Sequence, residues 1–554
     1  MNDKILMSVH LFFFCIIAFF SFIWYDKKAF SWRGKGMIYN MYSEVMSCGL
    51  VGIQGVLIRV EADVRDGLPS VSMVGSLSAS VRESKDRVIT AIKNIGIPIP
   101  PKRITINFSP ADLKKEGTAF DLPIAIAILS SYGYFPNNTL QEQCFFGEIG
   151  LNGDIKPVKG ILSMVAHAKE QGLAICFVPY GNRYEASIMK EIQICPVKTL
   201  KEVIFFLQNP TKRKIWNQNF QQNQSENFEE ESDFLDVFGQ HFAKRGAEIC
   251  AAGRHNYLLL GPPGSGKSMI ASRIPSLMPK LTMEEGLELT KIYSVKGELK
   301  EEAVLMTKRP FRAPHHTITE VGLIGGGYLP KPGEITMAHT GVLFLDEFPE
   351  FSRSTLEVLR QPLEEKKITI TRRNHTITYP ADILLLGAMN PCPCGYYPNL
   401  EKCHCTPLQM KSYLNRISHP LLERIDLMAE VTAVSYDDLQ GKGEKESSEK
   451  MKKRVEHAVS RQKERYKKMK IGFNGQLQGK AIEKFCSLDK KGEKLLQYVF
   501  EQRNWSARTY YRVLKVARTI ADLEQSDEIL EEHLIEAIAY RGLEEKYWGQ
   551  SYGI

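Results

Sequence analysis

The chain has 554 residues, of which 43% are hydrophobic and 25% charged, and its formal net charge is +8. This balance excludes a disordered or low-complexity protein, and the length predicts three or four domains at about 150 residues each. Four of the 11 cysteines stand close together and the others are scattered, which excludes a disulfide scaffold and favours a reducing, cytoplasmic location.

Residues 5–25 are almost entirely apolar or aromatic, and a basic cluster follows them. The stretch is long enough to span a bilayer, with the basic cluster keeping the rest on the cytoplasmic side. A signal peptide would need a small-residue cleavage site, which is not obvious here. We favour a third interpretation, in which translation begins at Met37 or Met41. Residues 1–40 are then an apolar extension, and a membrane partner is expected only if residues 5–25 are translated.

Residues 42–207 alternate short strands and helices, as in an α/β domain with its own core. We expect strands at Val56–Val64 and Arg103–Phe108, and helices at Ser80–Asn94 and Asp121–Ser131. Residues 208–233 are polar and rich in Gln and Asn, which predicts a linker. A helix over Phe234–Gly253 then leads into the next domain.

An apolar strand after Asn256 runs directly into the pattern G-x-x-x-x-G-K-S, which predicts a phosphate-binding loop. Its glycines let the backbone turn so that N–H groups point at phosphate oxygens, and the next helix adds its positive end. Lys267 would reach the β- and γ-phosphates of ATP, and Ser268 would hold Mg²⁺. The residues of this loop are Gly261, Pro262, Pro263, Gly264, Ser265, Gly266, Lys267 and Ser268.

A second apolar strand, Gly341–Leu345, ends in the adjacent carboxylates Asp346 and Glu347. Asp346 would complete the Mg²⁺ shell, and Glu347 would orient and deprotonate the attacking water. A phosphate-binding loop alone can be a chance match. The loop together with this strand, each in the correct context, predicts ATP hydrolysis.

Between these two strands lies an insert that begins at Arg309–His316 and whose glycines and prolines predict projecting loops. After Glu347, Thr355–Glu365 is expected to be a helix. Two segments that alternate with period two then predict a β-hairpin with Arg372 and Arg373 at its tip. The hairpin either faces solvent or enters a central channel.

Ile383–Asn390 is predicted to be a buried strand, and Asn390 at its end is placed where a γ-phosphate sensor belongs. Thiolates spaced C-x-C, eight residues, C-x-C can form a tetrahedral zinc site. His404 could replace one ligand, and reduced free thiols on a loop are the alternative. The four cysteines are Cys392, Cys394, Cys403 and Cys405.

Arg424 is a candidate arginine finger for the γ-phosphate of a neighbouring subunit, with Arg416 as the competing candidate. The alternative for Arg424 is a surface salt bridge with Glu423 or Asp426. Residues 436–554 are predicted to be helical, and Arg508 follows the helix N-cap Ser506. An arginine in that first turn is opposed by the helix dipole and often serves a phosphate, so we expect a second sensor.

Residues 441–470 contain 12 Lys/Arg against 5 Asp/Glu, and a long basic helix is expected over Met451–Lys470. Such a stretch either follows a polyanion such as DNA or is a solvated helix face.

The chain from about Tyr42 to Tyr547 resembles the magnesium-chelatase-like AAA+ ATPases, and within them the YifB/ComM group. The likeness is carried by Gly261–Ser268, Arg309–His316, Gly325–Gly327, Val342–Glu347, Asn390–Gly395 and Leu421–Asp426, and in the N-terminal part by Gly67–Ser70, Pro110–Gly117 and Phe120–Ala125. His419 departs from the glycine usual in that group, which weakens the transfer of finger geometry to Arg424.

The resemblance implies an α/β multidomain protein with a Lon-protease-like N-terminal α/β domain over 42–207. An AAA+ P-loop α/β domain follows over 234–435, and a C-terminal helical lid domain over 436–554. It also implies a homo-oligomeric ring, a hexamer, with ATP between subunits. Ala119 and Leu162 align with the Lon serine and lysine, so a Lon-like fold without peptidase activity is expected.

Two functions remain in competition. The YifB/ComM likeness implies a motor on single-stranded or branched DNA, associated with branch migration in natural transformation. The alternative is a chelatase-like remodeller of a protein or metal-insertion partner, which would need a separate partner because the signature D-x-S-x-S does not occur. We expect the DNA motor.

Overall fold

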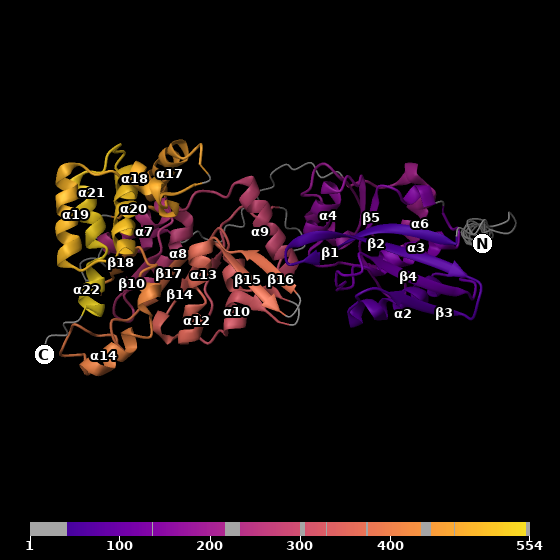
Figure 1. The fold of residues 1–554 in the computed structure, drawn as a ribbon, viewed down its shortest axis with the longest axis horizontal. Coiled ribbons are helices and arrows are strands. Elements are labelled where there is room, and N and C mark those ends of the chain that lie inside the picture. The colour runs from indigo at the N-terminus through magenta and orange to yellow at the C-terminus, as the bar shows by residue number, and fades with distance from the viewer. Residues whose placement is uncertain are drawn as a thin grey trace, which may run out of the picture.

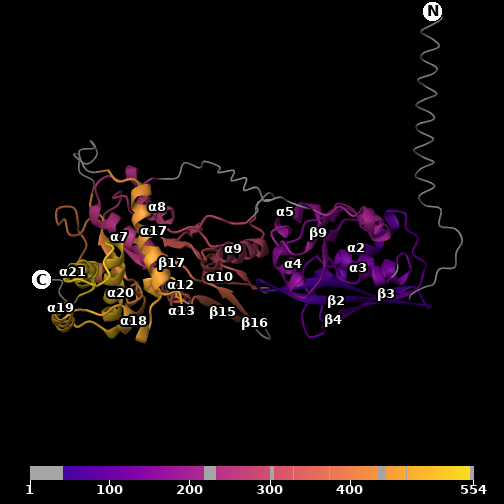
Figure 2. The same ribbon diagram turned by 90° about the horizontal axis from the view of Figure 1, so that it is seen from above.

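The computed structural model describes residues 41–549 except 136, 217–232, 300–304, 328–329, 373–374, 434–444 and 470. The molecule is elongated, with a large sheet at one end, a parallel sheet in the middle and a group of helices at the other end (Figures 1 and 2). The apolar extension 1–40 and most of the expected linker lie outside the described residues. Among the residues that are described, none of the helices combines the length and apolarity needed to cross a membrane.

The N-terminal unit is built on a seven-stranded sheet in the order β3-β4-β2-β1-β5-β8-β9. Strands β1, β2 and β4 pair antiparallel, whereas β3 joins β4 in parallel and β5, β8 and β9 continue from β1 in parallel. The strands are β1 (Tyr42–Val51), β2 (Gln54–Arg65), β3 (Ser70–Val74), β4 (Arg103–Ser109), β5 (Gln143–Phe145), β8 (Ile175–Pro179) and β9 (Gln193–Val197), with the small pair β6 (Glu148–Ile149) and β7 (Ile155–Lys156) beside them.

Helix α3 (Asp121–Ser131) forms the centre of this unit because most of its residues are apolar or small, and all of them, including Asp121, are buried. Helix α2 (Ala79–Asn94) is amphipathic, and the Ser78 side chain caps it by accepting a hydrogen bond from the Val81 N–H. The remaining helices of the unit are α4 (Ile161–Glu170), α5 (Arg183–Ala186) and α6 (Leu200–Gln208).

The middle unit contains a five-stranded parallel sheet in the order β11-β14-β17-β10-β18. Strand β10, which precedes the phosphate-binding loop, lies between β17 and β18, and β14 lies on the far side of β17. Because all strands run the same way, their carboxyl ends meet at one edge, where ligands bind in open α/β sheets. The strands are β10 (Tyr257–Leu260), β11 (Phe311–Arg312), β14 (Val342–Leu345), β17 (Leu384–Met389) and β18 (Leu427–Glu430).

Helices and short strands surround this sheet, and the β15–β16 hairpin extends from it toward the N-terminal unit (Figures 1 and 2). These elements are α7 (His241–Gly253), α8 (Lys267–Leu277), α9 (Met283–Lys296), α10 (Glu320–Ile324), β12 (Gly325–Gly326), β13 (Lys331–Pro332), α11 (Glu334–Met337), α12 (Arg353–Glu357), α13 (Arg360–Glu365), β15 (Lys367–Arg372), β16 (His375–Pro380), α14 (Pro407–Leu414) and α15 (His419–Leu422).

The C-terminal helices share a hydrophobic core with one face of the parallel sheet. A single buried cluster includes Leu259 of β10 and Ala388 of β17 together with Val455 and Ile520 of the helices. The described C-terminal helices therefore pack as part of the sheet unit. They are α17 (Ser448–Arg465), α18 (Lys480–Phe485), α19 (Lys490–Gln502), α20 (Ala507–Leu523), α21 (Glu531–Ala539) and α22 (Gly542–Trp548).

The N-terminal and middle units touch through backbone and apolar contacts. The Gly160 N–H donates to the carbonyl of Ser294 in α9 at 3.1 Å. In the turn between β1 and β2, a Cβ at Gly52 would lie 2.7 Å from the Ile377 side chain of β16, so the turn packs directly on the hairpin.

Several expected boundaries differ from those observed. The expected helix Thr355–Glu365 is two short helices, because Pro362 has no N–H to bond the carbonyl four residues earlier. The helix expected from Phe234 begins at His241, after positive φ values at Gly239 and Gln240.

Two further boundaries differ as well. The basic helix ends at Arg465 instead of Lys470. The linker was expected to start at Gln208. The backbone N–H of Trp216 still donates to the carbonyl of Ile194 in β9, so the N-terminal unit extends beyond the expected boundary.

Candidate functional site

The phosphate-binding loop follows β10 at the carboxyl edge of the parallel sheet. Gly264 and Gly266 have φ values of +72° and +92°, which favour glycine. Gly261 does not have a positive φ of this kind. A Cβ there would lie 2.1 Å from the Val431 carbonyl oxygen, so the first glycine serves a close backbone approach and not the tight turn we expected.

The ammonium group of Lys267 is held at this loop. Its Nζ donates to the carbonyls of Gly261 and Pro262 at 2.8 Å each and to the Asn390 Oδ1 at 3.2 Å. Burial lowers the pKa of Lys267, and the nearby Asp346 carboxylate opposes that shift. The lysine at the start of α8 and the asparagine at the end of β17 are therefore in direct contact.

The candidate Mg²⁺ ligands also lie together. Ser268 Oγ donates to Asp346 Oδ2 at 2.6 Å, and the Glu347 N–H donates to Asp346 Oδ1 at 2.9 Å. A hydroxyl and a carboxylate at this distance fit a shared hard cation such as Mg²⁺. Glu347 has a φ of +50°, an uncommon left-handed backbone for this residue type, and its side chain is 59% exposed.

A pocket of about 640 Å³ connects these groups. Four of its lining residues, Ala313 to His316, come from the loop after β11, and reasoning from the sequence missed their role. His316 Nδ1 lies 3.0 Å from Glu347 Oε2, and its ring is 4.1 Å from that of His315. Paired histidines after a strand that adjoins the Asp-Glu strand were the available signal.

Arg424 and Arg508 lie away from this pocket and close to each other. Both line a second pocket of about 280 Å³, which shares no described lining residue with the first. Arg424 is buried, contacts Glu364 and donates to the Pro420 carbonyl. Burial lowers the pKa of its guanidinium, and Glu364 opposes that shift. The ion pair of Arg424 is therefore with Glu364, not with either carboxylate considered from the sequence.

Arg508 and Arg416 also have carboxylate partners. Arg508 contacts Glu423 at 3.4 Å and Glu364 at 3.6 Å. Arg416, the competing finger candidate, pairs with Glu350 at 2.7 Å.

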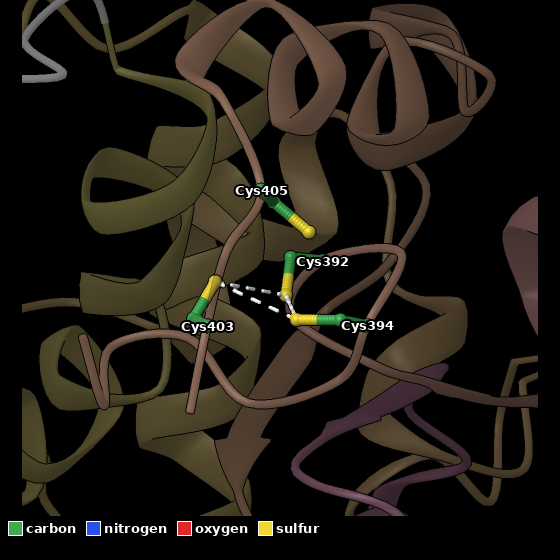
Figure 3. Close-up of side chains that lie close together, drawn as sticks. All are labelled: Cys392, Cys394, Cys403 and Cys405. Atoms are coloured by element: carbon green, nitrogen blue, oxygen red, sulfur yellow. Dashed lines mark hydrogen bonds between the residues drawn. The ribbon is translucent and has the colours of Figure 1, made fainter. Parts of the chain in front are cut away.

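The four clustered cysteines form a compact group on the loop after β17 (Figure 3). Each can offer a sulfur within 4.8 Å of the other three. The sulfur of Cys392 lies 3.3 Å from that of Cys394 and 3.7 Å from that of Cys403, and the last two are 3.6 Å apart. His404 does not belong to this group, so the donor set consists of four sulfurs.

The arginines of the basic stretch in the C-terminal region pair with carboxylates of the protein. Arg454 of α17 contacts Glu248 and Glu446. Arg461 contacts Asp527, and Arg465 donates to Asp522 at 2.8 Å. The exposed positive charge of α17 and its end is thus reduced to lysines such as Lys463, Lys467 and Lys468. The side chains at the hairpin tip, Arg372 and Arg373, lie outside the described residues.

In the N-terminal unit, Ala119 is 8% exposed and Leu162 is fully buried. Neither side chain offers a nucleophile or a base, and both belong to apolar packing. The Leu162 N–H donates to Glu185 Oε1 at 3.1 Å, which ties α4 to α5.

Comparison with known proteins gives matches along most of the chain. The model for magnesium chelatase, subunit ChlI, matches residues 233–439, and two further ChlI models match 60–182 and 445–541. Competence protein ComM of Haemophilus influenzae is 39% identical over 90% of this chain and 97% of its own. YifB of Salmonella typhimurium is 41% identical over 89% of this chain and 96% of its own. Lon protease 2 of Bacillus subtilis is 31% identical over 27% of this chain and 28% of its own.

Proposed function

The chain belongs to the magnesium-chelatase ChlI family, as a protein of the YifB/ComM type, and from that premise we propose that it is a Mg²⁺-dependent AAA+ ATPase. We further propose that it forms a ring, a hexamer, and uses hydrolysis to move on or remodel DNA. The single observation that carries the ATPase proposal is the convergence of Lys267, Ser268, Asp346 and Asn390 at one pocket.

The residues of the pocket divide the reaction among them. Lys267 binds the β- and γ-phosphates. Ser268 and Asp346 would hold Mg²⁺, which would neutralise charge on the phosphates. Glu347 orients the attacking water and accepts its proton for an in-line displacement at the γ-phosphate. Asn390, in contact with Lys267 at 3.2 Å, senses that phosphate.

Arg424 supports the ring. Arg424 and Arg508 line a pocket apart from the one around Lys267, as expected of groups that serve the nucleotide of a neighbouring subunit. We therefore keep Arg424 as the arginine finger and Arg508 as the second sensor. Arg424 would have to break its ion pair with Glu364 to reach a phosphate. Within one chain its guanidinium is paired with Glu364.

Two observations of different kinds support DNA as the polymer on which the proposed motor acts. One relative bears the name competence protein, and exposed lysines gather at the end of α17. Lysines that contact phosphates release counterions, so such binding weakens steeply with salt and is largely independent of sequence. We also propose zinc as a cofactor. The four clustered cysteines would bind it, because tetrahedral sites of four sulfurs favour zinc.

The test is the ATPase rate of residues 41–554, with and without single-stranded, duplex and branched DNA, at two salt concentrations. We expect DNA to raise the rate, more strongly at low salt. Glu347→Gln should bind ATP but turn over roughly 100- to 10,000-fold more slowly, the range that general bases contribute. Lys267→Ala should lose nucleotide binding.

The outcomes separate the proposals. Normal turnover by Glu347→Gln would contradict its role as base. An active ATPase that ignores every DNA would reject the DNA motor and favour a remodeller of a protein or metal-insertion partner, as the chelatase family models suggest.

A further inference from the structure

We propose that residues 391–406, here called the cysteine loop, are a metal-held brace that fixes the phosphate-binding loop against Asn390 and the C-terminal helix α22. The metal is a structural zinc ion bound by Cys392, Cys394, Cys403 and Cys405. The metal site stands on geometry alone, whereas its effect on nucleotide binding rests on the function proposed above.

The sulfur positions fit a metal centre. Thiolates about 2.3 Å from a tetrahedral zinc ion are about 3.8 Å from one another. The observed separations of 3.3, 3.6 and 3.7 Å are near that value. A disulfide requires about 2.05 Å, so none of these three pairs is bonded. Four thiols without hard oxygen ligands also disfavour Mg²⁺ and Ca²⁺.

The cysteine loop has only a small hydrophobic cluster around its cysteines. It connects β17 to α14, and its described residues form no helix or strand. Its own hydrophobic cluster has three buried members, Cys392, Cys403 and Met410, with Cys394, Tyr397 and Cys405 packed against them. Most of this small core is therefore the sulfur group itself. Metal binding by these four sulfurs would add folding free energy to this segment.

The loop lies directly against the nucleotide pocket. Asn390, which contacts Lys267 at 3.2 Å, is two residues from Cys392. A Cβ at Gly395 would be 2.6 Å from Pro263 Cδ of the phosphate-binding loop and 3.7 Å from Asn390 Cγ. Gly395 also has a φ of +84°. A metal that fixes the loop backbone on both sides of Gly395 thereby fixes the wall of the pocket.

The other side of the loop reaches the C-terminal helices. The rings of Tyr397 and Tyr547 of α22 are 6.1 Å apart at an interplanar angle of 71°. The Trp548 Nε1 donates to the Leu414 carbonyl, at the end of α14, at 3.3 Å. The cysteine loop thus joins α22 to the phosphate-binding loop through one small metal-held segment.

The metal is tested by elemental analysis of the full chain purified without added metal. We expect one zinc per chain in the wild type and less than about a tenth of that in Cys392→Ser and Cys403→Ser, because each removes a ligand of a four-coordinate site. Cys486→Ala, which alters a buried cysteine outside the group, should keep its zinc. Equal zinc in the wild type and Cys392→Ser, or iron in place of zinc, would overturn the assignment.

A second measurement needs no variant that could fail to fold. Cobalt exchanged into the wild type should give the intense visible bands and the sulfur charge-transfer band of a tetrahedral thiolate site. A weak octahedral spectrum would overturn the site.

The brace is tested by Gly395→Ala, which keeps all four thiols. We expect full zinc content and about tenfold weaker binding of the fluorescent probe mant-ATP, because the added Cβ would lie 2.6 Å from Pro263 Cδ and would displace the phosphate-binding loop. Gly96→Ala is the matched control, since Gly96 has a φ of +83° with open space around its Cβ position.

The two arms fail separately. Gly395→Ala with full zinc and wild-type mant-ATP affinity would overturn the brace while leaving the metal site. A zinc-containing wild type that binds no mant-ATP would instead overturn the proposed ATPase.

Discussion

The carboxylate of Glu347 is held by a histidine from a different segment of the chain. His316 Nδ1 lies 3.0 Å from Glu347 Oε2, and the rings of His316 and Phe351 are 6.4 Å apart between centroids in an edge-to-face arrangement. The left-handed backbone at Glu347 places the side chain in the pocket beside Asp346. We infer that His316 acts through Glu347 as a positioning residue.

The position of His316 leads to a kinetic prediction. His316→Ala should lower kcat about tenfold, a part of the roughly 100-fold or more that a general base contributes, while the affinity for mant-ATP stays nearly unchanged. His316→Gln keeps a hydrogen-bond donor and should recover much of the rate. His457→Ala, on the exposed side of α17, is the control. An equal loss of affinity and rate would show that His316 binds nucleotide instead.

At the scale of elements, α17 is more a structural helix than its composition suggests. Its apolar residues Met451, Val455 and Val459 are buried, and its arginines contact carboxylates of the body. Asp522 of α20 is fully buried. Its carboxylate pairs with Arg465 and, at 3.1 Å, with the guanidinium of Arg518. Buried charges of this kind need their partners because desolvation is costly.

Two variants on the same helix separate structure from surface charge. Arg465→Ala should destabilise the C-terminal helices by about 2 kcal/mol, because it leaves a buried carboxylate with fewer partners. Lys453→Ala removes an exposed pair with Glu449 and should leave the thermal midpoint unchanged. Differential scanning calorimetry measures both. Equal midpoints for the two variants would contradict the structural role of Arg465.

For the whole molecule, the separation of the two pockets agrees with the proposed ring, because one chain does not bring Arg424 to the pocket around Lys267. The pocket around Lys267 has no arginine among its described lining residues, and Arg424 lies in the other pocket. A head-to-tail ring brings the second pocket of one subunit to the first pocket of the next. The reacting site is then built between subunits.

Mixing inactive variants tests this arrangement. Arg424→Ala and Lys267→Ala should each be inactive alone, but equal amounts mixed into rings should regain about one quarter of the wild-type rate, since a quarter of the interfaces pair an intact pocket with an intact finger. Size-exclusion chromatography of the mixture confirms that mixed rings have formed. Mixed rings without activity would exclude Arg424 as a finger acting between subunits.

Local patterns along the chain are enough to predict the candidate groups whose geometry is local. A strand, a glycine-rich loop and a helix start are adjacent along the chain, so Lys267 and Ser268 could be assigned from spacing, as could Asp346 and Asn390 at strand ends. Parallel strands then bring these ends together. The buried helix Asp121–Ser131 could be predicted in the same way, because most of its residues are apolar.

Contacts across the fold could not be predicted in this way, because they depend on strand order and packing that no local pattern encodes. The order β11-β14-β17-β10-β18 brings the loop after β11 to the pocket and so places His316 beside Glu347. Packing gave Arg424 the partner Glu364 and merged the C-terminal helices with the core of the sheet. The approach of Gly395 to Pro263 likewise requires two loops from neighbouring strands to meet.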